Sequence, residues 1–75
     1  MSVSDILIHI NEHLSDQERK TLEESMRRID GVVAPRFNQG KKHLLLVAFD
    51  PMATSTEALL AKVQALGYHA QLVGA

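Results

Sequence analysis

The stretch ILIHINEHLSDQERKTLEESMRRIDG, residues 6–31, contains the signals of a strand followed by a helix. Residues 6–10 are β-branched or apolar, and polar residues at positions 11 and 12 end the run. The two-residue period of a strand places Ile6, Ile8 and Ile10 on one face and Leu7 with His9 on the other. The chain therefore begins with a strand that has one strongly apolar face.

The helix that follows has a well-marked start and end. Ser15 and Glu18 have the spacing of a capping box, in which each side chain binds the backbone N–H of the other residue. Leu22, Met26 and Ile29 recur every four and three residues and form an apolar stripe. Gly31 ends the helix.

The remaining residues predict further strands and a second helix. We expect strands over residues 32–37, 43–49 and 68–73, a hairpin turn over 38–41 and a second helix over 55–66. Pro35 cannot donate to a ladder and favours an edge strand, and either Thr54 or Ser55 can cap the second helix. The pattern predicts one α+β domain over residues 1–75, a ferredoxin-like βαββαβ fold with a four-stranded antiparallel sheet and two helices on one face. The predicted core consists of Ile6, Ile8, Ile10, Leu22, Met26, Ile29, Pro35, Phe37, Leu45, Val47, Phe49, Leu59, Val63, Leu66, Ala70 and Leu72.

The composition of the chain argues against several classes of function. Eight Lys and Arg against nine Asp and Glu give a formal net charge of −1 in 75 residues. This near-balance argues against a nucleic-acid binder or a protein held on a membrane surface by charge, and no apolar run is long enough to cross a bilayer. The sequence contains no Cys and no basic leader, and we expect a cytoplasmic protein. No nucleophile and base are arranged for catalysis, so we expect no enzyme.

The sequence resembles the heavy-metal-associated domain family of copper chaperones and copper-ATPase N-terminal domains. The resemblance extends from about residue 6 to residue 72. Its markers are Asp30-Gly31-Val32, Phe49-Asp50-Pro51, Ser55 with Leu59 and Val63 behind it, and Gly67-Tyr68. It implies the same fold and a metal-handling function.

The departure from the family falls at its metal-binding motif. Family members carry Cys-x-x-Cys between the first strand and the first helix, and its two thiolates hold a soft metal ion. Ser15 and Glu18 occupy the two cysteine positions here, and His13 occupies the position of the family's methionine. The thiol site is therefore lost, and a metal ion here would be bound by His and carboxylate side chains.

The candidate ligands are His13, Glu18 and Asp16, which suit a divalent transition metal such as Zn, Ni or Cu. The capping role of Glu18 is the alternative explanation for that residue. His9 and His69 are a possible second site, because the family's strand order places the first and last strands side by side. Both histidines can equally be exposed polar residues.

The alternative to metal handling is a metal-independent interaction module. Leu44, Leu46 and Ala48 point away from the helices if Leu45 points inward, and Leu7 joins them from the neighbouring strand. An apolar patch on the open face of a sheet often marks a protein contact. We therefore expect a protein partner or a homodimer, although scattered surface leucines are also common.

Overall fold

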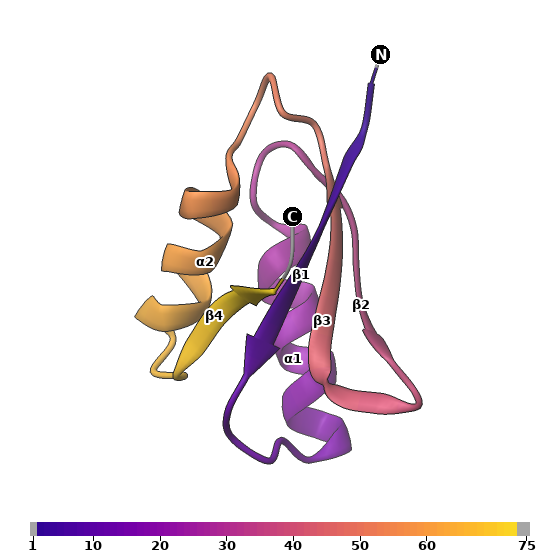
Figure 1. The fold of residues 1–75 in the computed structure, drawn as a ribbon, viewed down its shortest axis with the longest axis vertical. Helices are drawn as coiled ribbons and strands as arrows, with labels where there is room; N and C mark the ends of the chain where they lie inside the picture. Colours follow the sequence, from indigo (N-terminus) through magenta and orange to yellow (C-terminus); the bar gives the residue numbers. More distant parts are fainter. Residues whose placement is uncertain (1, 74–75) are drawn as a thin grey trace.

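The computed structural model describes residues 2–73. The elements follow the order β1 (Ser4–Ile10), α1 (Asp16–Arg27), β2 (Val32–Asn38), β3 (Lys41–Phe49), α2 (Thr56–Ala65) and β4 (Ala70–Val73). The strands form one antiparallel sheet in the order β2-β3-β1-β4, and the two helices pack against one face of it (Figure 1). This confirms the ferredoxin-like α+β fold predicted from the sequence, with β2 at an edge as Pro35 indicates.

Both helices begin at side-chain caps. The Ser15 hydroxyl accepts from the Glu18 N–H at 3.1 Å, and the Glu18 carboxylate accepts from the Ser15 N–H at 2.8 Å. The capping box predicted for α1 is therefore present. At α2, the cap is Ser55, whose hydroxyl accepts from the Ala58 N–H at 3.2 Å.

The core lies between the helices and the inner face of the sheet. It comprises Ile6, Ile8, Ile10, Leu22, Met26, Leu45, Val47, Phe49, Leu59, Val63 and Ala70. The prediction of the core is wrong at two positions, because Leu66 is 43% exposed and Leu72 is 40% exposed. Leu66 is the C-cap of α2, and at this end of the helix its side chain stays open to solvent. In the part of the chain that the structure describes, neither helix is long and apolar enough to span a membrane.

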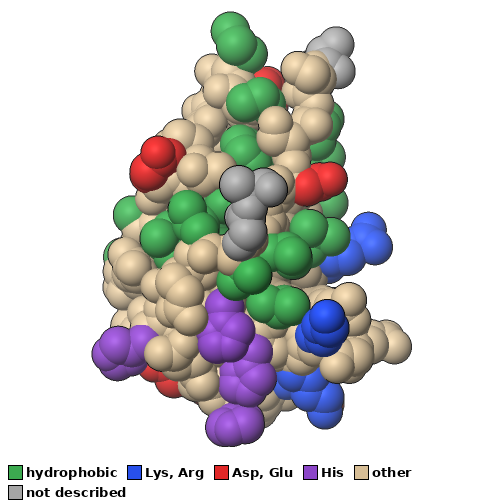
Figure 2. Space-filling model, viewed as in Figure 1, with side chains coloured by type: hydrophobic (Ala, Val, Ile, Leu, Met, Phe, Trp, Pro, Cys, Tyr) green, Lys and Arg blue, Asp and Glu red, His purple; other side chains and the backbone are tan. Residues whose placement is uncertain are grey.

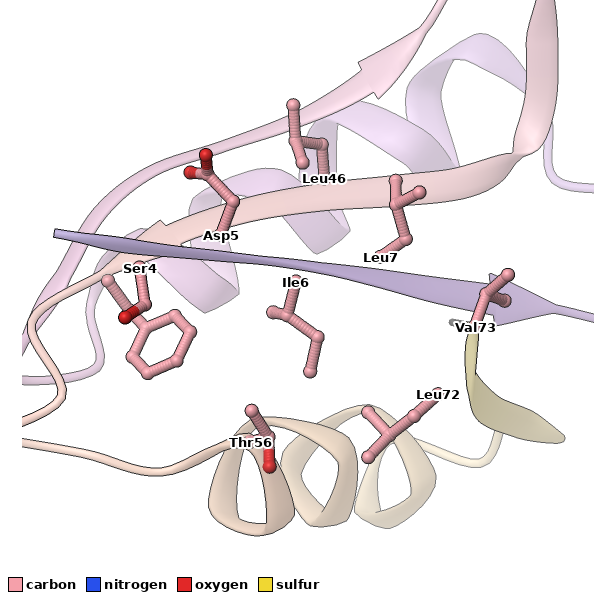
Figure 3. Close-up of a pocket in the computed structure, with 9 residues that line it drawn as sticks. Ser4, Asp5, Ile6, Leu7, Leu46, Thr56, Leu72 and Val73 are labelled. Carbon is pink, nitrogen blue, oxygen red and sulfur yellow. The ribbon is translucent and has the colours of Figure 1, made fainter. Parts of the chain in front are cut away.

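The exposure of Leu72 follows from the shortness of β4. This strand pairs with β1 only from Leu7 to Ile10, so the first half of β1 has no partner strand on that side among residues 2–73. A hollow of about 600 Å³ lies there, and Figure 3 shows Ile6, Thr56 and Leu72 around the space between β1 and α2. Leu72 faces inward by register, opposite Ile8, but it lines this hollow and is only partly covered.

Gly31 joins the end of α1 to the end of β3. Its φ of +94° lies in the left-handed region that favours glycine. Its carbonyl accepts from the Asp50 N–H at 2.7 Å, and a Cβ built on Gly31 would lie 2.7 Å from the Cβ of Ala53. The turn after α1 therefore packs tightly on the turn before α2.

Candidate metal-binding site

The loop between β1 and α1, residues 11–15, is tied to the residues that precede β4. The backbone N–H of Asn11 donates to the His69 carbonyl at 2.8 Å. The Glu12 carboxylate accepts from the His69 N–H at 3.0 and 3.1 Å, and one of its oxygens lies 2.7 Å from His69 Nδ1. These contacts fix the start of the loop that carries His13.

The two carboxylates that the sequence assigned to His13 have other partners. Asp16 forms an ion pair with Arg19, and Glu18 is held by the capping box with Ser15. The hydrogen bonds from the Ser15 N–H and hydroxyl hold the pKa of Glu18 below its ordinary value of 4.5. Among residues 2–73, no three His, Asp or Glu side chains stand ready to hold a metal ion.

The structure instead places His13 beside His43, which in turn stacks on His9. The ring centroids of His13 and His43 are 4.7 Å apart with the rings edge to face, and those of His9 and His43 are 5.6 Å apart with the rings stacked. We call His9, His13 and His43 the histidine cluster. Figure 2 shows histidine side chains gathered in a column below the hydrophobic side chains. No sequence pattern singles out His43, because its position depends on the register between β1 and β3.

The expected pairing of His9 with His69 does not form. The register between β1 and β4 places Gln71 opposite His9, and the amide nitrogen of Gln71 lies 2.9 Å from His9 Nδ1. Because Ile10 is opposite Ala70, His69 lies beyond the paired segment and binds Glu12 instead. The two histidines therefore belong to different groups of side chains.

The contact between Glu12 and His69 predicts a dependence of stability on pH. The hydrogen bond from the His69 side chain, with help from the His69 backbone N–H, holds the pKa of Glu12 below its ordinary value of 4.5. A carboxyl whose pKa falls on folding stabilises the folded state above its unfolded pKa, and this contribution is lost as the pH falls through the folded pKa. We therefore expect Glu12→Gln to destabilise the domain at pH 7 and to make its stability depend less on pH below 4.5.

Urea unfolding of both proteins between pH 3 and pH 7 measures this difference. Glu24→Gln is a control for loss of a carboxylate on a helix, since Glu24 lies at an exposed position of α1. Parallel stability curves for the parent protein and Glu12→Gln across this range would contradict the expectation.

The face of the sheet opposite the helices is largely apolar at its centre. Leu7 pairs with Leu46, Leu44 lies opposite His9, and Ala48 lies opposite Asp5, all at half-exposed positions. We call Leu7, Leu44, Leu46 and Ala48 the leucine face. Arg36 pairs with Leu46 from β2, and with Lys41 it lines a hollow of about 700 Å³ beside the leucines. The leucine face is thus bordered by cations at β2 and by the histidine cluster at one end.

A thiolate-bound Cu(I) ion, which the family resemblance implies, does not fit these residues. The two positions that match the family's cysteines hold a hydroxyl and a carboxylate, and both are committed to the cap of α1. Cu(I) is selected by soft sulfur ligands, whereas imidazole and carboxylate suit Zn, Ni and Cu(II). The chemistry available near the loop is therefore that of borderline divalent ions.

Comparison with solved structures identifies the fold. No family model matches the sequence, and no curated protein matches it. The N-terminal domain of a potential copper-translocating P-type ATPase from Bacillus subtilis, in its Cu(I)-loaded state, superposes with a TM-score of 0.83 at 21% identity, over 95% of this chain and 88% of that one. Oxidized MerP from Ralstonia metallidurans CH34 gives 0.81 at 15% identity over 95% and 97%.

The copper chaperone of Enterococcus hirae, in its apo form, gives a TM-score of 0.79 at 20% identity, over 91% of this chain and 98% of that one. These chains have nearly the same length as ours and the same arrangement of elements. At this level of identity the likeness concerns the fold, and it agrees with the resemblance in the sequence. The chain has the fold of the heavy-metal-associated domains and lacks the pair of cysteines that characterises them.

Proposed function

We propose that this chain is a metal-handling domain that binds a divalent transition metal, Zn, Ni or Cu(II), through His13. The observation that carries the proposal is the position of His13. It lies exposed in the β1–α1 loop, with its ring edge-on to His43 at 4.7 Å. Neutral imidazole is a common ligand for all three ions. The similarity in fold to a copper chaperone and to a copper-ATPase domain supports the proposal.

The two candidate carboxylate ligands, Asp16 and Glu18, would each have to leave a different partner to bind a metal ion. The Asp16 side chain is 88% exposed, whereas its partner Arg19 is 15% exposed, and an ion pair whose carboxylate lies in water contributes about 1 kcal/mol, so Asp16 can turn toward a metal ion near His13. Glu18 would have to leave the capping box and give up the hydrogen bond that it accepts from the Ser15 N–H at 2.8 Å. We therefore place Asp16 before Glu18 as an oxygen ligand. We expect the domain to act in the cytoplasm and to exchange its metal with a protein partner.

Replacing His13 by alanine is expected to abolish stoichiometric metal binding, because it removes the ligand on which the proposal depends. Native mass spectrometry of the tag-free protein, with one equivalent of Zn²⁺, Ni²⁺ or Cu²⁺, measures both metal content and oligomeric state. His69→Ala is the matched control, since His69 is the histidine outside the cluster and contacts Glu12. Equal metal content in His13→Ala and in the parent protein would exclude the proposed function.

A second candidate function, a metal-independent interaction module, is supported by the leucine face. Three leucines and an alanine occupy adjacent half-exposed positions on two central strands, where an open sheet in water usually carries polar side chains. A second copy of the chain would cover these residues, as would another protein. In this case the heavy-metal-associated fold would serve as a scaffold without its metal chemistry.

If the leucine face forms a homodimer, Leu46→Glu is expected to raise the dimer dissociation constant at least about tenfold, because it places a charge at the centre of the contact. Sedimentation equilibrium measures the change, and circular dichroism checks that the domain stays folded. Met52→Glu is the control, since Met52 is 92% exposed in the loop before α2. A monomer at all concentrations for the parent protein would exclude the homodimer.

A further inference from the structure

The histidine cluster is assembled from three separate parts of the chain. His9 is on β1, His13 is on the following loop, and His43 is on β3. The register places Leu44 opposite His9, so His43 lies one position further along, near the end of β1. There its Nδ1 lies 2.7 Å from the Ile10 carbonyl oxygen. The backbone therefore holds two of the three rings close together, and the loop brings the third.

The hydrogen bond of His43 prepares its ring for a metal ion. A carbonyl oxygen only accepts, so His43 Nδ1 carries the proton and Nε2 keeps a free lone pair. An imidazole that donates one ring N–H to a backbone carbonyl while the other nitrogen faces outward is the usual arrangement of metal-binding histidines. His43 is thus oriented by the protein before any metal is present.

His9 has an equivalent partner in Gln71. The Gln71 amide lies 2.9 Å from His9 Nδ1. An amide turned by 180° presents its oxygen to an Nδ1–H and leaves Nε2 of His9 as the free nitrogen. The same turn breaks the hydrogen bond that the Gln71 amide N–H donates to Asn11 Oδ1 at 3.2 Å, so the Asn11 amide has to turn as well and donate to the Gln71 oxygen. Rotation of two exposed amides therefore converts His9 into a ligand.

Two of the three ring separations in the cluster, those to His43, are close to the value for a tetrahedral site. With metal–nitrogen distances of about 2.0–2.1 Å, two imidazoles at a tetrahedral angle have ring centroids about 5 Å apart. The two separations in the cluster, 4.7 and 5.6 Å, lie on either side of this value. The stacked rings of His9 and His43 have to turn so that their nitrogens converge. The site therefore forms only when the rings turn on binding, in agreement with the absence, among residues 2–73, of three side chains already placed for a metal ion.

We propose that His9, His13 and His43 form a three-imidazole site for a divalent transition metal, with the fourth ligand supplied by water or by a partner. The inference rests on the proposed function, because it names the ligands that act with His13. It replaces the carboxylates, which have other partners, with the imidazole of His43, which adjoins His13, and that of His9, which adjoins His43. Three nitrogen ligands with an open fourth position suit Zn²⁺ and Cu²⁺, and they do not favour Cu(I).

The test is calorimetric titration of the tag-free protein with Zn²⁺ and with Cu²⁺. The variants are His9→Ala, His13→Ala and His43→Gln, with His69→Ala as the control. Glutamine at position 43 retains an N–H that can donate to the Ile10 carbonyl, so it removes the imidazole with the least effect on folding. We expect one metal ion per chain, and a loss of affinity of at least about tenfold in each of the three cluster variants. The control is expected to keep the parent affinity.

Nuclear magnetic resonance of the imidazole nitrogens in the parent protein gives a result that does not depend on any variant. Zn²⁺ is expected to shift one ring nitrogen in each of three histidines and to leave His69 unchanged. If only His13→Ala weakens binding and only His13 shifts, the three-imidazole site is excluded while the proposed function stands. If the parent protein binds neither ion, both are excluded. A shift of His69 would also overturn the assignment.

Discussion

Replacing Leu45 by alanine is expected to lower the free energy of unfolding by about 2–5 kcal/mol, the range for a leucine removed from a packed core. Leu45 is fully buried at the centre of β3, next to Ile8 of β1 and Phe37 of β2. A domain of this size has a total stability of about 4–11 kcal/mol. The substitution therefore removes a large share of it, and urea unfolding followed by circular dichroism measures the loss.

Leu44→Ala is the matched control for this experiment. It removes the same atoms from the adjacent residue, which lies half-exposed on the opposite face of the sheet. Because part of this side chain stays in water in the folded protein, whereas all of Leu45 is buried, we expect a smaller loss, below about 1.5 kcal/mol. Equal losses at the two positions would show that the two faces of β3 are buried to the same extent, contrary to the structure.

Gly31→Ala is expected to lower the free energy of unfolding by about 2–3 kcal/mol. A φ of +94° costs a residue with a Cβ about 1–2 kcal/mol, and the new Cβ would also lie 2.7 Å from the Ala53 Cβ. That contact is with a side chain that cannot rotate away, so the turn itself must move. For a domain of 60–100 residues, thermal unfolding should shift by about 4–8 °C for each kcal/mol.

Gly67→Ala separates the cost of a positive φ from the cost of the contact with Ala53. Gly67 has a φ of +100°, but no described atom lies within 4 Å of a Cβ built there. We therefore expect Gly67→Ala to cost only the conformational strain, about 1–2 kcal/mol. A Gly31→Ala protein no less stable than Gly67→Ala would mean that the turn beside Ala53 accommodates a methyl group.

The fold was predictable because local signals agree with one another along the chain. The alternation of Ile6, Ile8 and Ile10, the capping box at Ser15 and the proline in β2 each point to the element that is observed. The exposure of Leu72 was not predictable, because it depends on where β4 ends and on which residues pack against that end. The alternation of apolar residues with a period of two predicts the face of the sheet on which a side chain lies. It does not predict whether another element packs on that face.

The candidate site was only partly predictable for a similar reason. His13 could be singled out because it lies in the loop between the first strand and first helix. His43 could not, because its approach to His9 and His13 depends on the register of two strands far apart in sequence. The carboxylates were assigned to the metal from spacing alone, and spacing does not show that Arg19 and Ser15 already engage them.

The position of β4 beside β1 has a consequence for synthesis of the chain on the ribosome. His9 of β1 lies opposite Gln71 of β4, so one edge of β1 stays unpaired until β4 has been synthesised. β3 ends at Phe49 and β4 ends at Val73, and a ribosome that adds about 5–20 residues per second needs about 1–5 s for that interval. During this time β1 and β3 are already made, while Ile8 and Ile10 lie along an open backbone edge. Delaying translation between residues 49 and 73 is therefore expected to increase aggregation of the nascent chain more than an equal delay within the first helix.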